Sequence, residues 1–212
     1  MGVLHNTKCR PCKIKTQYMI NNKSIRKEII TNFVSQLLSI FNEDISRDDL
    51  KETPQRVFRM YKELLSGYFQ NPKDVFKTFK SNGYKDLISI TNIRFYSLCE
   101  HHMIPFFGSV HIGYVPNGRV LGLSKFVRLI EILSHRLQTQ ENLTNQIADI
   151  LEENLKPRGL AVIVEAEHLC ISMRGVRKVN CITKTTILKG LLKKNSKLTD
   201  QFYREINNQK DK

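Results

Sequence analysis

Four consecutive residues near the middle of the chain carry metal-binding and acid–base chemistry. In the stretch YSLCEHHMIPFFG, a thiol, a carboxylate and two imidazoles stand together as Cys99, Glu100, His101 and His102. Cys99 and His102 have the C-x-x-H spacing with which a strand end or turn presents two ligands to one metal ion. This spacing is common by chance, so the metal interpretation needs a further ligand from elsewhere in the chain.

Cys170, in the stretch EAEHLCIS, is the best candidate for that ligand because it ends an apolar run and follows His168 by two residues. Two thiolates and one imidazole suit Zn²⁺ and leave a fourth position open for water. A structural zinc would be closed by a fourth Cys or His instead. The sequence therefore predicts a hydrolytic zinc site at Cys99, His102 and Cys170, which iron could also occupy in cells.

The two histidines beside the expected ligands are predicted to handle protons. On an extended backbone neighbouring side chains point apart, whereas residues two apart share a face. His101 is then directed towards a substrate, and His168 shares a face with Cys170. Because imidazole titrates near neutrality, both rings suit general acid–base roles. Glu100 is expected to orient the metal ligands without binding the metal itself.

The other thiols and imidazoles carry weaker signals. Cys9 and Cys12, in CRPC, have metal-like spacing but no partner pair, and are expected to be exposed thiols in a tail. Cys181 alternates with strand residues and is expected to pack. Three single histidines are expected to be structural or solvent-facing: His5, His111 and His135.

Several cations indicate an anionic ligand. The stretch GLSKFVR places Ser124, Lys125 and Arg128 at the start of a predicted helix, where free amides, a hydroxyl and positive charge form a phosphate site. Arg174 and Arg177 follow in MRGVRK. Either basic stretch alone is more typical of a solvated surface. Together with the expected metal ligands, the two stretches indicate a phosphorylated substrate.

Gln140 and Glu141 begin another predicted helix, in QTQENL. A carboxylate at that position favourably meets the positive end of the helix dipole, which is the simpler interpretation. It could also accept paired hydrogen bonds from a guanidine-like edge of a ligand.

The composition fits a globular chain in the cytoplasm. The chain has 212 residues, of which 41% are hydrophobic, and no apolar run approaches the roughly 20 residues of a membrane helix. There is no apolar signal core near the first residue, and five scattered cysteines favour reduced thiols over a disulfide framework. Much of the +14 net charge sits in the Lys-rich stretches KCRPCKIK and LKKNSK, which are more typical of solvating tails than of a nucleic-acid site.

The periodicity of apolar residues predicts an α+β architecture. Helices, a pair of strands, two helices, a second pair of strands and a short helix follow in order, which favours a four-stranded antiparallel sheet with helices on one face. The open edges of such a sheet favour pairing with another subunit. The expected segments are a basic flexible extension (1–22) and a domain (23–212). The domain is expected to begin with N-terminal helices (24–67), the second of which runs from Thr53-Pro54 to a stop at Gly67. The rest of the domain is expected to contain four strands (87–99 with a phase break, 108–123, 159–172 and 177–188), a helix from a cap at Ser124, a helix over 140–155 and a C-terminal helix (about 197–208).

These motifs closely resemble the GTP cyclohydrolase I family. The resemblance runs from DDLKETPQRVFRMYKELLSGY through SLCEHHMIPFFGSVHIGYVPNGRVLGLSKFVRLIEILSHRLQTQENLTNQIA to HLCISMRGVRKVNCITKTT, covering most of residues 48–190. It implies the T-fold (tunnelling fold) with a core at about 86–190, and pentameric barrels that pair into a decamer with sites at subunit interfaces. It also implies conversion of GTP and water to 7,8-dihydroneopterin triphosphate and formate, the first step towards tetrahydrofolate or tetrahydrobiopterin.

The resemblance also implies roles for individual residues. It places the zinc ligands on Cys99, His102 and Cys170, and the acid–base histidines on His101 and His168, with Ser124 assisting the later ribose rearrangement. Guanine recognition falls on Glu141 with Gln140 beside it, and the remaining substrate contacts fall on Ser124, Lys125, Arg128, Arg174 and, from a neighbouring subunit, Arg56. Three positions depart from the family pattern: Arg59 replaces a common lysine, and His135 and Asn142 replace arginines.

Three other functions remain open. A reductase or epimerase of the same fold, acting on pterin or deazaguanine substrates, would not need the full metal and histidine set. A basic, zinc-stabilised nucleic-acid-binding protein would have a closed metal site and aromatic residues among its cations. A degenerate, inactive relative would lack some of the residues matched to chemistry, and all of them are present here.

Overall fold

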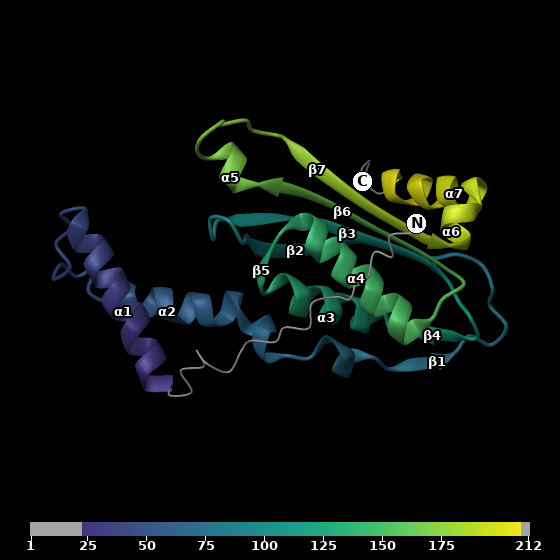
Figure 1. Ribbon diagram of the computed structural model, residues 1–212, viewed down its shortest axis with the longest axis horizontal. Helices are drawn as coiled ribbons and strands as arrows, with labels where there is room; N and C mark the ends of the chain where they lie inside the picture. The colour runs from purple at the N-terminus through teal and green to yellow at the C-terminus, as the bar shows by residue number, and fades with distance from the viewer. Residues whose placement is uncertain (1–22, 209–212) are drawn as a thin grey trace, which may run out of the picture. The chain divides into compact units, whose positions relative to one another are not determined.

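The computed structural model describes residues 23–208, which fall into two units, Met1–Leu64 and Leu65–Lys212 (Figure 1). The expected extension 1–22, with His5, Cys9 and Cys12, lies outside the described residues. Within residues 23–208, no helix is long and apolar enough to cross a membrane.

The described part of the first unit consists of the two expected helices, α1 (Lys23–Ile40) and α2 (Thr53–Leu64). Pro54 is buried in the first turn of α2, where a missing N–H costs no helical hydrogen bond. The helix α2 ends at Leu64, three residues before the expected stop at Gly67. Gly67 lies in the next short helix, η2 (Ser66–Phe69), where a side chain would collide with the carbonyl oxygen of Ile132.

The second unit is built on a five-stranded sheet in the order β5–β2–β3–β6–β7 (Figure 1). Its four long strands are antiparallel, which confirms the expected α+β class, and the two-residue β5 runs parallel to the end of β2. A separate pair, β1 with β4, was not expected. The strand bounds are β1 (Thr78–Lys80), β2 (Ile88–Cys99), β3 (Pro105–Val115), β4 (Arg119–Leu121), β5 (Leu137–Gln138), β6 (Gly159–His168) and β7 (Ile182–Gly190).

Two long helices, α3 (Leu123–Ser134) and α4 (Gln140–Leu155), cover one face of this sheet and enclose the main core. The C-terminal helices α6 (Leu191–Lys194) and α7 (Ser196–Asn207) pack on the other face instead. The reason is the continuous apolar run of β6, in which Val162 faces α3 and α4 while Ala161 and Ile163 face α7. Helices therefore lie on both faces, although α7 covers only part of the second one.

The expected phase break in the first long strand is confirmed. The pairing of β2 with β3 shifts between Ile90 and Ile93, and Asn92 has a left-handed backbone with φ of 58°. Such a bulge inserts an extra residue and restores the apolar alternation on the core face, which continues with Phe95.

Two strand expectations were too long. The strand β6 ends at His168, whose partner in β3 is Phe106. Because the two strands are antiparallel, Leu169 would have to pair with Pro105, which has no N–H to extend the ladder. Residues 169–172 form the short helix α5 (Leu169–Ser172) rather than more strand. The strand expected from residue 177 is β7, which begins only at Ile182. Cys181 therefore lies before this strand and is exposed, whereas it was expected to pack.

The start of α3 differs from expectation, whereas α4 begins at Gln140 as expected. The residue at the N-cap of α3 is Gly122, and Ser124 lies inside the first turn. At α4 the cap is Thr139, whose hydroxyl accepts a hydrogen bond from the Asn142 N–H at 3.1 Å. This cap fixes the position at which Gln140 and Glu141 enter the helix.

Candidate metal centre and active site

The three expected metal ligands come together at one end of the sheet. The ligand atoms of Cys99, His102 and Cys170 all lie within 4.8 Å of one another. Cys99 is the buried last residue of β2, His102 is exposed in the following loop, and Cys170 is half-buried in α5. The end of β2, the loop after it and the short helix after β6 therefore supply a Cys–His–Cys group that can bind a metal ion.

The loop that carries His102 is closed by backbone hydrogen bonds to Cys99. The N–H of Cys99 donates to the Ile104 carbonyl at 2.9 Å, and the N–H of Met103 donates back to the Cys99 carbonyl at 2.8 Å. Met103 adopts a left-handed backbone with φ of 54° to make this turn. The N–H of Glu100 donates to the Gln138 carbonyl at 3.0 Å, which ties the loop to β5. The ligand spacing is thus held by main chain.

The donor chemistry of the group fits a divalent cation. Burial raises the pKa of the Cys170 thiol, and the neighbouring Cys99 raises it further, while the charge of Arg174 acts in the opposite direction. Two sulfur atoms held this close disfavour a second thiolate in the absence of a cation. A bound divalent ion would remove that penalty and displace the thiol protons.

His101 also lies at this group. Its Nδ1 is 3.7 Å from the sulfur of Cys99, and its ring is edge-on to that of His102 with centroids 6.2 Å apart. With a proton on Nδ1, the ring would donate to the Cys99 sulfur and stabilise its thiolate form. The exposed His101 side chain remains open to solvent and to a ligand.

His168 is held between an aromatic ring and a buried amide. Its ring lies parallel to that of Phe106, with centroids 4.8 Å apart, and its Nε2 is 2.8 Å from Oε1 of Gln140. Burial lowers the pKa of His168, and the charge of Glu141 raises it by a smaller amount. The ring is therefore predominantly neutral near pH 7, in reach of the exposed carboxylate of Glu141.

The predicted anion site on α3 is not beside the metal group of the same chain. Ser97, two residues before Cys99, donates its hydroxyl to the carbonyl of Ser134 at 2.7 Å, which places the last turn of α3 near the metal end of β2. Ser124 lies in the first turn of this 12-residue helix, about 15 Å from Ser134 along the helix axis. Figure 1 shows the same separation: α5 and β4, which precedes α3, lie at opposite ends of the sheet. Lys125 shares that distant end with Ser124, and Arg128 lies about one turn further on, near the middle of α3.

Three other expected substrate contacts are exposed arginines. Arg174 follows α5, close enough for its charge to act on Cys170. Arg56 and Arg59 lie on α2 in the first unit, and Arg56 bonds to the Asp49 carbonyl at 3.2 Å and to the Glu52 carboxylate at 3.4 Å.

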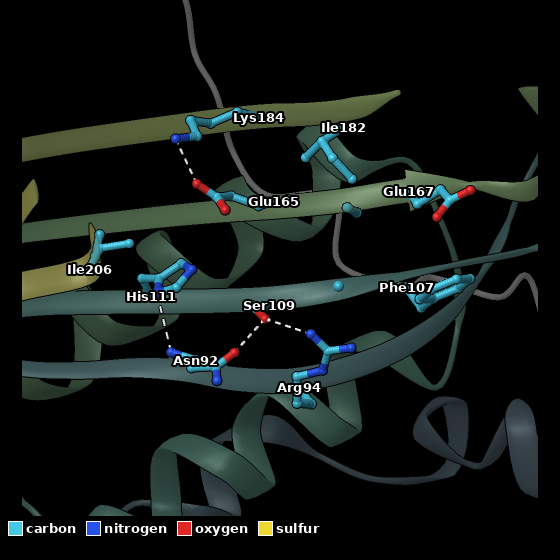
Figure 2. Close-up of a pocket in the computed structure, with 12 residues that line it drawn as sticks. Asn92, Arg94, Phe107, Ser109, His111, Glu165, Glu167, Ile182, Lys184 and Ile206 are labelled. Atoms are coloured by element: carbon cyan, nitrogen blue, oxygen red, sulfur yellow. Dashed lines mark hydrogen bonds and ion pairs between the residues drawn. The ribbon is translucent and has the colours of Figure 1, made fainter. Parts of the chain in front are cut away.

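A hollow of about 630 Å³, lined by both polar and apolar residues, lies on the face of the sheet that α7 partly covers (Figure 2). Figure 2 shows the ion pair between Lys184 and Glu165, and the hydrogen bond that Arg94 donates to the hydroxyl of Ser109. The buried His111 accepts the Asn92 N–H at 3.2 Å, in line with its expected structural role. The residues that line the hollow are Asn92, Arg94, Phe107, Gly108, Ser109, His111, Glu165, Ala166, Glu167, Ile182, Lys184 and Ile206. None of the three metal-binding residues is among them.

Sequence reasoning missed Phe106, although it touches His168 through its ring. The signal for it was the pair of phenylalanines after Pro105, because one of two neighbouring strand residues must face the core. Its pairing with His168 could not be seen, since the register of β3 against β6 is a long-range property.

Comparison with known proteins agrees with this geometry. Residues 30–207 match the family model described as GTP cyclohydrolase I. The chain is 46% identical to GTP cyclohydrolase 1 of Campylobacter jejuni strain RM1221, over 84% of this chain and 94% of that one. It is 48% identical to GTP cyclohydrolase 1 of Helicobacter pylori strain G27, over 81% of this chain and 96% of that one. The corresponding protein of Campylobacter concisus is 44% identical, over 87% and 98% of the two chains. With its α+β sheet, its metal-binding group and these matches along nearly its whole described length, the chain belongs to the GTP cyclohydrolase I family.

Proposed function

We propose that this chain hydrolyses GTP to 7,8-dihydroneopterin triphosphate and formate, with Zn²⁺ held by Cys99, His102 and Cys170. The observation that carries the proposal is the gathering of these three ligand atoms within 4.8 Å of one another, with His101 and His168 alongside. Family membership supports the same reaction, which is the first step of pteridine biosynthesis. The proposed catalytic domain spans residues 23–212, with a T-fold core at about 86–190.

The metal and the histidines divide the chemistry. When bound, zinc would activate a water molecule for attack on the imidazole carbon of guanine. Because the pKa of His168 is lowered by burial, its ring is ready to accept a proton near pH 7. The exposed His101 would deliver a proton to the imidazole nitrogen of guanine and so make the adjacent carbon more electrophilic.

Glu141 is the proposed anchor for guanine. Its exposed carboxylate lies in the first turn of α4, near the ring of His168. A carboxylate accepts two hydrogen bonds from the N1–H and 2-amino edge of guanine, which adenine does not offer. This contact would hold the imidazole ring of the base over the metal-binding group. Gln140 precedes it in the same turn.

The triphosphate site is proposed to come from a neighbouring subunit. Ser124 and Lys125 sit at the far end of α3 from the metal group of their own chain, with Arg128 one turn further on, so one GTP molecule would have difficulty contacting both ends. A second copy that brings its α3 to this metal group would complete the site, and there Ser124 would assist the ribose rearrangement. Arg174, Arg56 and Arg59 are the further cations proposed to bind phosphate.

The sheet offers edges for that second copy. Among the described residues, the nine-residue β7 pairs only with β6, and the outer side of β2 carries only the two-residue β5. Joining β7 of one chain to β2 of the next would close the sheets into a ring. We propose that five chains form such a ring and that two rings pair into a decamer. The described cysteines are all free thiols, which fits a cytoplasmic location.

The test is incubation of the zinc-loaded protein with GTP, with formate and pterin absorbance recorded together. ATP is the matched control, because it carries the same triphosphate but lacks the guanine edge that Glu141 would bind. Equal amounts of formate and pterin from GTP, and none from ATP, are expected. A folded, zinc-loaded protein that yields neither product from GTP would contradict the proposal.

A further inference from the structure

Gln140 is buried at the start of α4, with only 1% of its surface exposed, and every polar atom of its amide is engaged. The amide nitrogen is 3.0 Å from the Val164 carbonyl and 3.0 Å from the Thr183 carbonyl. The amide oxygen is 2.8 Å from Nε2 of His168. The side chain therefore links α4 to β6 and β7 and ends on a proposed catalytic ring.

The orientation of this amide is fixed by its partners. Backbone carbonyl oxygens only accept hydrogen bonds, so the group that faces Val164 and Thr183 must be the NH₂. Turning the amide over would bring its oxygen to 3.0 Å from both carbonyl oxygens, so that acceptors would face one another with no proton between them. The amide oxygen must therefore point at His168.

Two threonine hydroxyls hold the NH₂ group in the same direction. Thr144 donates its single proton to the Gln140 backbone carbonyl at 2.7 Å. Its contact with Thr185 at 2.6 Å must then be donated by Thr185, which leaves the Thr185 oxygen to accept from the Gln140 NH₂ at 3.1 Å. The two NH₂ protons are shared among three acceptors, the carbonyls of Val164 and Thr183 and the hydroxyl of Thr185, and reversing the amide would break this network.

We propose that Gln140 is a positioning residue that fixes the orientation and tautomer of His168, so that the ring exchanges its catalytic proton at Nδ1. An amide oxygen cannot donate, so Nε2 of His168 must carry a proton at 2.8 Å. In the neutral ring, Nδ1 is then the nitrogen with a free electron pair. The parallel Phe106 ring, 4.8 Å away, limits tilting of the imidazole about this hydrogen bond.

This assignment differs from direct recognition of the substrate by Gln140. A guanine contact would need an amide group that is free and exposed, and the 1% exposure and complete hydrogen bonding of this side chain provide neither. Glu141, the next residue, is exposed and can take that contact. The inference rests on the proposed function only in calling the proton exchange catalytic.

The first test is kinetic. Gln140→Leu removes the hydrogen bond to His168 at similar volume, and kcat for GTP is expected to fall about 10–100-fold, the range seen when an orienting partner is lost. KM should stay within about 2-fold, because no ground-state contact is removed. Ile163→Val, on the same strand as His168 but in the core of the opposite face, is the matched control for buried substitution and should keep kcat. A higher KM with unchanged kcat in Gln140→Leu would overturn the inference.

The second test is decided by the native protein alone. The ring-carbon and ring-nitrogen NMR shifts of labelled histidine distinguish the two neutral tautomers, and His168→Asn identifies the His168 signal. The native protein should show the Nε2–H tautomer at neutral pH, and Gln140→Leu should show a mixture. An Nδ1–H tautomer in the native protein would overturn the inference. A native protein that shows Nε2–H but forms no formate from GTP would contradict the proposed function instead.

Discussion

The ring of His168 lies parallel to the ring of Phe106, at a centroid distance of 4.8 Å and an interplanar angle of 0°. The two residues are also register partners, since Phe106 pairs with His168 in the ladder between β3 and β6. The fully buried Phe106 forms part of the main core, so the packing of the sheet sets the plane of the His168 ring.

Replacing Phe106 should impair catalysis more than it impairs folding. Phe106→Leu keeps an apolar core but removes the flat surface against which His168 lies, and we expect kcat for GTP to fall roughly 3- to 10-fold because the ring is less well oriented. Steady-state kinetics at saturating zinc would measure the change.

Phe202→Leu is the matched control for that experiment. Phe202 is equally buried, but it belongs to the core under α7 on the other face of the sheet. It should lower the unfolding midpoint without changing kcat. If both variants lowered kcat alike, the effect of Phe106 would reflect loss of core packing rather than the position of His168.

Mixed oligomers should reveal whether the active site spans two chains. Cys170→Ala lacks the metal group and Lys125→Ala lacks a cation of α3, so each variant alone should be nearly inactive. Coexpressed with different tags and purified through both, the mixture should recover up to about a quarter of native activity, because a random interface unites one intact half-site from each chain with that frequency.

The same mixture also has a clear opposite result. If the metal group and α3 of one chain served the same GTP molecule, mixing would create no complete site. Activity at the level of the separate variants, in oligomers shown by mass spectrometry to contain both chains, would contradict a shared site.

Lys189 should stabilise the fold in a pH-dependent way. It bonds to Asp149 at 2.8 Å and to Glu152 at 2.6 Å, joining β7 to α4. Burial lowers the pKa of Lys189, but the bonds to these two carboxylates outweigh it and raise the pKa above 10.5. Lys189→Met should therefore cost about 1 kcal/mol of unfolding free energy at neutral pH, since the ion pairs are partly exposed.

The sign of the pH effect follows from the raised pKa. The contribution of Lys189 is fully present below the pKa of the unfolded chain and is lost as pH rises through the higher folded value. Urea unfolding of the native and Lys189→Met proteins should give curves that differ at pH 7 and converge as pH rises above the pKa of Lys189 in the folded protein. Lys193→Met, an exposed residue of α6, should leave stability unchanged. A constant difference at all pH values would contradict the ion-pair explanation.

Local patterns in the sequence predicted most of the fold. The period of apolar residues located α1 to α4 and the bulge in β2, and the C-x-x-H spacing with Cys170 located the metal group. Where local patterns failed, tertiary pairing decided the outcome. The ladder of β6 stops at Pro105 of β3, and β4 pairs with β1 far along the chain.

The role of Gln140 shows the same limit within the site. Its place before Glu141 at a helix start suggested a contact with the substrate, and the sequence contains no local sign of its partners. Those partners are main-chain carbonyls of Val164 and Thr183, which are brought to Gln140 only by the packing of α4 on β6 and β7. Hydrogen bonds to main chain leave no mark in residue type, so this link had to come from the structure.

The most direct test of the whole account is zinc per chain and formate per GTP, measured on the same preparations of native protein, Cys170→Ala and Cys181→Ala. Cys181 is an exposed thiol outside the Cys–His–Cys group, so its variant controls for loss of a cysteine as such. The account predicts about one zinc per chain and formate release for the native protein and Cys181→Ala, and loss of both for Cys170→Ala. Full formate release from a zinc-free Cys170→Ala protein would contradict it.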